Sequence, residues 1–286
     1  MGRVDQLPVE DILSLDELAA MRRARYRQTE VTHLRTEADA LDFINDLGFV
    51  WLINLSDADL PSLHHAAPQP YEGEESRDAE KAESWWDSKQ TLPGRKACYY
   101  SKVLRGRGTF ISWECFPAFH AVYATGNDYE YDYRAGILSR DEKRVLDLIA
   151  ACPGIPSPEL RKRFGPIGKA TTRALDRALQ SLQETFRITV AGGSLEGWTI
   201  HNWALVEDWV PRRHLDEARK TDRSVAQEEL ALRYVRMAVA VTEGDIAWVF
   251  RWKRRATAEM VQRLVDEGRL HEVEVMEMPG VMFFME

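Results

Sequence analysis

The chain has 286 residues, of which 44% are hydrophobic and 10% aromatic, so it is long enough to form two or three compact units with hydrophobic cores. The formal net charge of −8 excludes a uniformly basic nucleic-acid-binding protein, but it does not exclude a local cationic patch. The three cysteines are scattered and odd in number, which excludes a disulfide scaffold and predicts reduced thiols in a cytoplasmic protein.

The N-terminal part of the chain predicts two helices followed by a buried segment. The first helix begins at Ser14, where Glu17 completes a capping box. The second starts at Thr36, carries an apolar stripe and ends at Gly48. Residues 49–55 are almost all apolar, which predicts a buried strand or a buried helical turn. Four arginines crowd the far end of the first helix, either as a solvated face or as a phosphate-facing surface: Arg22, Arg23, Arg25 and Arg27.

The middle of the chain changes the sign of its charge. Residues 68–87 are rich in acidic side chains, and we expect an exposed loop that holds much of the surplus negative charge. Lysines and arginines then gather in residues 95–107. Beyond them we expect a strand at 110–113, a short helix at 117–124, and an edge strand or ordered loop at 127–134.

From Ser139 to the end, the sequence passes twice through three helices followed by a hairpin, which is the order typical of a winged helix. The first pass has helices starting at Ser139 and Ser157, a helix over 169–184, and a hairpin over 186–203 that turns at Gly192 and Gly193. The second has a helix over 224–239, a helix capped by Thr242, a helix after Lys253, and a hairpin over 270–285. Residues 209–221 between them form a connector or a short linking helix.

The third helix of the first pass carries a cationic face. Lys169, Arg173 and Arg177 are spaced by four residues, so they share the side of the helix opposite its leucines. Such a helix can enter the major groove, and Thr172 in its first turn can donate to phosphate. The alternative is an ordinary solvated helix face.

The third helix of the second pass begins in a denser cationic cluster that includes Lys253, Arg254 and Arg255. A helix N-terminus already favours phosphate, so this cluster is a second candidate DNA contact. Some winged helices bind only proteins, and that alternative stays open here.

The familiar enzyme motifs are missing from the sequence. It contains no G-x-S-x-G, H-E-x-x-H, Walker or G-x-G-x-x-G pattern. His64 and His65 are adjacent, so their side chains point in different directions and do not predict a metal site. We therefore expect no metal and no cofactor.

The order of these parts resembles the bacterial winged-helix DNA glycosylases that excise alkylated purines and unhook interstrand crosslinks. The strongest stretch is LALRYVRMAVAVTEGDIAWVFRWKRRATAEMVQRLVDEGRL, at residues 230–270. The stretches GTFISWECFPAF, LSRDEKRVLDLI and ALDRALQSL are similar to the middle of that family. The resemblance implies a tandem winged-helix fold around a DNA channel.

The sequence departs from this family at the catalytic positions. The family places a polar pair, Gln-x-Gln or Gln-x-Asp, just after the helix that ends in Leu-Gly, and here Trp51 and Ile53 stand in those places. Neither side chain can orient a water or stabilise a sugar cation. Asn54, Asp57 and His64 are the remaining polar candidates nearby.

We therefore expect a mainly α fold with small β hairpins. It would comprise an N-terminal helical, winged-helix-like unit with a degenerate site (1–138) and two winged helices (139–216 and 217–286). The expected function is binding of double-stranded DNA, plain or damaged, on a DNA-repair scaffold that lacks the usual catalytic pair. The alternatives are an active DNA glycosylase that uses other residues, and a transcription regulator or protein-docking module. We expect no membrane association.

Overall fold

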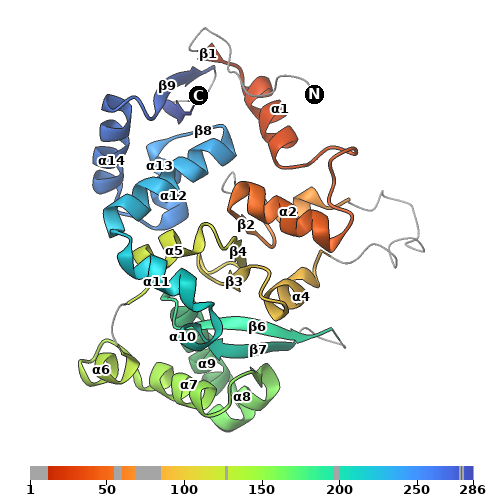
Figure 1. Cartoon of the computed structure of the whole chain (residues 1–286), viewed down its shortest axis with the longest axis vertical. Coiled ribbons are helices and arrows are strands. Elements are labelled where there is room, and N and C mark those ends of the chain that lie inside the picture. The colour runs from red at the N-terminus through yellow and green to blue at the C-terminus, as the bar shows by residue number, and fades with distance from the viewer. Residues whose placement is uncertain are drawn as a thin grey trace.

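The computed structural model describes residues 12–54, 60–68, 85–125, 128–195, 200–276, 278 and 280–285. Within these ranges one order of elements recurs three times: a helix, a short strand, two helices and two strands (Figure 1). The mainly α fold with small β sheets expected from the sequence is confirmed. One of the three repeats lies in the N-terminal part of the chain. The sequence predicted a winged-helix-like unit there but did not predict this full order of elements.

The three repeats have the following bounds. The first comprises α2 (Glu37–Leu47), β2 (Phe49–Trp51), α3 (Leu63–Ala66), α4 (Ser88–Gly94), β3 (Tyr99–Ser101) and β4 (Thr109–Ile111). The second comprises α7 (Arg140–Ala151), β5 (Ile155–Pro156), α8 (Ser157–Phe164), α9 (Lys169–Glu184), β6 (Ile188–Ser194) and β7 (Ile200–Leu205). The third comprises α12 (Arg223–Ala238), β8 (Ala240–Val241), α13 (Glu243–Phe250), α14 (Arg254–Asp266), β9 (His271–Val275) and β10 (Met282–Phe284).

The sheets share one strand order as well. In each repeat the last strand lies between the other two, giving β2-β4-β3, β5-β7-β6 and β8-β10-β9. These pairs are antiparallel, and β1 (Ile12–Leu13) extends the third sheet by pairing parallel to β9. Helix α1 (Leu15–Arg25) precedes the first repeat, and four further helices connect the repeats: α5 (Phe116–Tyr123), α6 (Tyr129–Arg134), α10 (Val206–Trp209) and α11 (Arg212–Lys220).

Polar caps explain several helix starts that the sequence predicted. Ser14, Thr36 and Thr242 each accept a hydrogen bond from the backbone N–H three residues on, and the acidic side chain there bonds back to the cap. Ser139 does the same at α7. The reciprocal bonds satisfy backbone donors that the first helical turn leaves unpaired, so the starts are fixed locally.

Ser157, expected to start a helix as its cap, is instead the first residue of α8, and its hydroxyl donates to the His201 carbonyl.

The expected strand or loop at 127–134 is wrong, because residues 129–134 form helix α6. Asp128 accepts hydrogen bonds from the backbone N–H groups of Glu130 and Tyr131, which caps the helix. The alternating tyrosines that indicated a strand are not an inward-facing row, since Tyr131 is exposed.

The expected turn at Gly192 and Gly193 is also wrong, because both lie inside β6 at a bulge. A Cβ on Gly192 would lie 2.9 Å from Gly94 Cα of α4, and one on Gly193 would lie 1.9 Å from the Ile200 carbonyl oxygen. The glycines therefore allow the second hairpin to approach both its own partner strand and α4.

The three repeats pack into one body around a continuous core. Phe49 of the first repeat makes an edge-to-face contact with Phe250 of the third, with ring centroids 5.9 Å apart. Tyr99 of the first stacks on Phe186, just before β6, at 5.1 Å. Within the described ranges, no helix combines the length and apolarity needed to cross a lipid bilayer.

Candidate nucleic-acid interface

One face of α9 carries exposed cations, as the sequence predicted. Lys169, Arg173 and Arg177 are all exposed, and the structure describes no hydrogen bond or ion pair from their side chains to any residue in the described ranges. Leu175 and Leu182 are buried on the opposite side of the helix. The packing of α9 thus leaves three positive charges facing solvent.

Thr172, the fourth candidate on this helix, is half-buried in its first turn.

The same face of α9 continues toward the first repeat. Gln180 and Glu184 lie on it at the end of the helix. A Cβ on Gly106, in the turn between β3 and β4, would lie 2.6 Å from Gln180 Nε2 and 3.4 Å from a Glu184 carboxylate oxygen. Glu184 also pairs with Arg251 of the third repeat at 3.0 Å. The face that begins at Lys169 therefore ends where all three repeats meet.

The second predicted cluster lies at the start of α14. Lys253 holds the N-cap position, and its side chain makes no capping bond. Lys253 and Arg254 are exposed, and neither side chain has a hydrogen bond or ion pair within the described part of the chain. Arg255 is 92% exposed and pairs with Glu259 at 2.9 Å. Lys253 and Arg254 are therefore more available to a ligand than Arg255.

The arginines at the end of α1 bind within the protein. Arg22 donates to the carbonyls of Ala238 and Ala240 at 2.8 and 2.6 Å, and Arg25 donates to the Arg236 carbonyl. Arg27 pairs with Asp46. Only Arg23 is exposed without a described partner. Three of the four arginines therefore anchor neighbouring segments, so they do not form a phosphate-facing row.

The two positions that the expected resemblance aligns with the family's polar pair, residues 51 and 53, hold core side chains. Trp51 is the last residue of β2 and is fully buried. Its ring lies edge-on to Trp248 at 6.4 Å, and the guanidinium carbon of Arg107 lies 4.8 Å from its centroid. Ile53 is half-buried against the main core. Neither side chain carries a group that accepts a proton, so no acid–base pair exists at these two positions.

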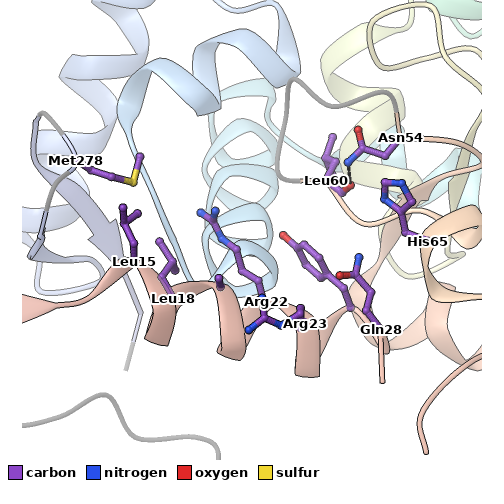
Figure 2. A pocket seen from close by; sticks show the side chains of 11 residues that line it. Leu15, Leu18, Arg22, Arg23, Gln28, Asn54, Leu60, His65 and Met278 are labelled. Carbon is purple, nitrogen blue, oxygen red and sulfur yellow. Dashed lines mark hydrogen bonds between the residues drawn. The ribbon is translucent and has the colours of Figure 1, made fainter. Parts of the chain in front are cut away.

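Asn54, the next residue, lines a pocket of about 300 Å³ beside α1. Asn54 and His65 lie at one end of this pocket, and Leu15 and Met278 lie at the other (Figure 2). The Asn54 amide donates to the Leu60 carbonyl at 2.8 Å. The pocket joins an apolar wall to a polar one, and its polar lining among the described residues consists of arginine, histidine, tyrosine and amide groups without a carboxylate.

The other polar candidates do not join Asn54. His64 lies on α3, where its ring contacts Trp85 at 5.1 Å and His65 at 5.2 Å, and it is His65 that lines the pocket. Asp57 lies outside the described residues, as does most of the acidic segment 68–87. Among the residues that the structure describes, no three histidine, cysteine or acidic side chains cluster as metal ligands.

Two arginines that the sequence analysis did not assign to any site lie at the junction of the repeats. Arg105 and Arg107 alternate with Gly106 and Gly108 in the turn between β3 and β4. The Arg105 guanidinium carbon lies 4.4 Å from the Trp248 ring centroid. The alternation of arginine and glycine in a hairpin turn was the available signal. This signal did not indicate which residues the arginines contact, because Trp51 and Trp248 reach the turn only through tertiary packing.

Comparison with known proteins bears on the family and the fold of the chain. The family model described as AlkZ related matches residues 34–251, which is more than half of the chain. Among solved structures, the DNA glycosylase AlkZ of Streptomyces sahachiroi is similar with a TM-score of 0.52 and 15% identity, over 95% of this chain and 70% of that one. At this identity the likeness shows the shared fold. Comparison with curated protein sequences finds no match.

The resemblance expected from the sequence is therefore confirmed at the level of family, and the fold is that of a DNA glycosylase. This protein belongs to the AlkZ-related family.

Proposed function

We propose that the chain binds double-stranded DNA, plain or damaged, on a glycosylase scaffold whose catalytic positions no longer hold a polar pair. In this proposal each repeat is a winged-helix unit, and the units from residues 139 and 217 onward present their third helices, α9 and α14, to the duplex. The family and fold of a DNA glycosylase support this choice of partner.

The cationic face of α9 is the observation that supports the proposal most strongly. Lys169, Arg173 and Arg177 have no acidic partner in the described part of the chain, although the chain as a whole has more acids than bases. Charges left unpaired in an acidic protein raise the local attraction for a polyanion. Their helix leads to the junction that holds Trp51, so a duplex along α9 would pass the family's catalytic position.

Loss of excision follows from the chemistry at residues 51 and 53. Cleavage of a glycosidic bond needs groups that orient water and stabilise positive charge on the sugar. An indole and a butyl side chain supply neither. Burial also lowers the pKa of His120 and His201 to about 4, so these half-buried histidines are neutral at physiological pH and supply no proton there.

The experiment is an anisotropy titration of labelled plain, alkylated and abasic duplexes with the full chain. We expect saturable binding at low salt that weakens as salt rises, because phosphate contacts release counterions. Absence of binding at low salt would overturn the proposal and favour a protein-docking module, whereas a sequence-specific footprint would identify a transcription regulator.

A second candidate function is an active glycosylase that uses Asn54, because this side chain lines the pocket next to the degenerate positions. Release of free base from alkylated duplex, lost in Asn54→Ala, would establish it.

The three cysteines are free, and two of them are buried. This pattern fits a reducing compartment, so we propose the cytoplasm as the location.

A further inference from the structure

The turn between β3 and β4 holds an arginine in an unfavourable backbone conformation. The Arg107 N–H donates to the Leu104 carbonyl at 3.0 Å, and the two residues between them have positive φ, 57° at Arg105 and 69° at Gly106. Glycine adopts this conformation readily, but a residue with a Cβ does not. Strain of this kind persists where the surrounding structure holds it, and it clusters at functional sites.

Both arginines of the turn stack on tryptophans. Arg105 lies over Trp248 and Arg107 over Trp51, with guanidinium carbons 4.4 and 4.8 Å from the ring centroids. The two indoles are themselves 6.4 Å apart. Each guanidinium group is thus held on one ring of this aromatic pair. Stacking uses the face of a guanidinium and leaves its in-plane N–H groups available for an acceptor.

Two donors at this place have no acceptor among the residues that the structure describes. Arg107 Nη1 and Trp51 Nε1 are buried and make no hydrogen bond to the described residues. Trp51 is fully buried, so its N–H lies inside the protein and does not contact DNA directly, whereas Arg105 and Arg107 are only half-buried. The nearby carboxylate of Glu184 is engaged by Arg251 at 3.0 Å. The donors open to a ligand at this junction are therefore the half-buried guanidinium groups of Arg105 and Arg107, and such groups bind an anion with several acceptor oxygens.

We propose that Arg105 and Arg107, supported by Trp248 and Trp51, bind one backbone phosphate of the DNA strand that follows the cationic face of α9. The inference rests on the proposed DNA-binding function and adds a contact that the α9 and α14 clusters do not include. The position that would excise a base in the family here holds the strand instead. Glycine at 106 permits the positive φ of the tight turn that carries both arginines.

The test measures the salt dependence of duplex affinity for Arg105→Gln, Arg107→Gln and Trp51→Phe. Each arginine variant should lose about tenfold in affinity at low salt, and the slope of log K against log salt should become shallower by up to about 0.9. Trp51→Phe keeps an aromatic ring under Arg107 and leaves the charge of the turn unchanged, so the slope should stay at the wild-type value. Arg212→Gln, at a highly exposed residue of α11 that pairs with Asp216, is the control and should change neither quantity.

A purely structural role for the stacked pairs predicts a different result. Thermal unfolding of the arginine variants would then shift while the salt slope stayed at the wild-type value, and that outcome overturns the inference. If Arg107→Gln fails to fold, Arg107→Lys keeps a charge and should retain the slope with reduced affinity; full affinity in that variant would also overturn it. If the α9 variants lose binding but the turn variants keep the wild-type slope, this inference is refuted and the proposed function stands. If the wild-type chain does not bind DNA, the proposed function itself is refuted.

Discussion

Neutralising the cationic face of α9 is the most informative change to the proposed interface. The variant replaces Lys169, Arg173 and Arg177 with glutamine in one chain. Each cation that contacts a phosphate contributes about 0.9 to the slope of log K against log salt, so three contacts should flatten the slope by about 2.7. At roughly 0.1 M salt the same counterion release corresponds to about eightfold in affinity per contact, or about 500-fold for three.

Anisotropy titrations of one labelled duplex at several salt concentrations measure both quantities. The three side chains are exposed and have no described partners, so urea unfolding should change by no more than about 0.5 kcal/mol. Arg212→Gln serves as the matched control at an exposed arginine on α11. Wild-type affinity and slope in the triple variant would refute the assignment of α9 to the duplex, provided that the variant folds as predicted.

Two further predictions concern stability. Gly193→Ala should destabilise the chain by about 1–3 kcal/mol in urea unfolding, because its Cβ would lie 1.9 Å from the Ile200 carbonyl oxygen. The control is Gly244→Ala, in a helix where the new Cβ would make only an ordinary contact at 3.4 Å. This variant should leave the free energy of unfolding unchanged or raise it slightly. The Arg35 backbone N–H donates to the Asp39 carboxylate and helps to hold its pKa below the usual value. The stabilisation is therefore present above the unfolded pKa of about 4 and lost as pH falls through the lower folded pKa, so the deficit of Asp39→Asn should shrink as the pH falls below about 4. A deficit that grows toward acid would contradict this sign.

Most of the longer helices and the two later hairpins followed from local signals in the sequence, whereas the short helices α3 and α4 were not predicted. A cap such as Thr36 or Thr242 and its acidic partner lie within one turn, so the start of the helix is encoded by neighbouring residues. The helix at 129–134 was missed because alternating tyrosines outweighed the cap at Asp128. Gly192 and Gly193 were misassigned to a turn because their role depends on α4, about a hundred residues away in sequence.

The candidate site was predictable only where it lies on one helix. Periodicity alone placed Lys169, Arg173 and Arg177 on a common face, and the structure has them exposed there. The junction required contacts among three repeats, since Arg107 meets Trp51 within the first repeat and Glu184 meets Arg251 across the other two. Sequence patterns carry no information on such long-range pairings, so the arginines of the turn were noticed without a role.

Incubation of the full chain with an alkylated duplex, at protein concentrations above its dissociation constant, tests the central claim most directly. Bound duplex and released base are measured in the same sample, with an active glycosylase as the positive control for excision. The account predicts that the duplex is bound and that free base does not exceed spontaneous depurination. Protein-dependent release of base would contradict it, because Trp51 and Ile53 would then not have removed the chemistry.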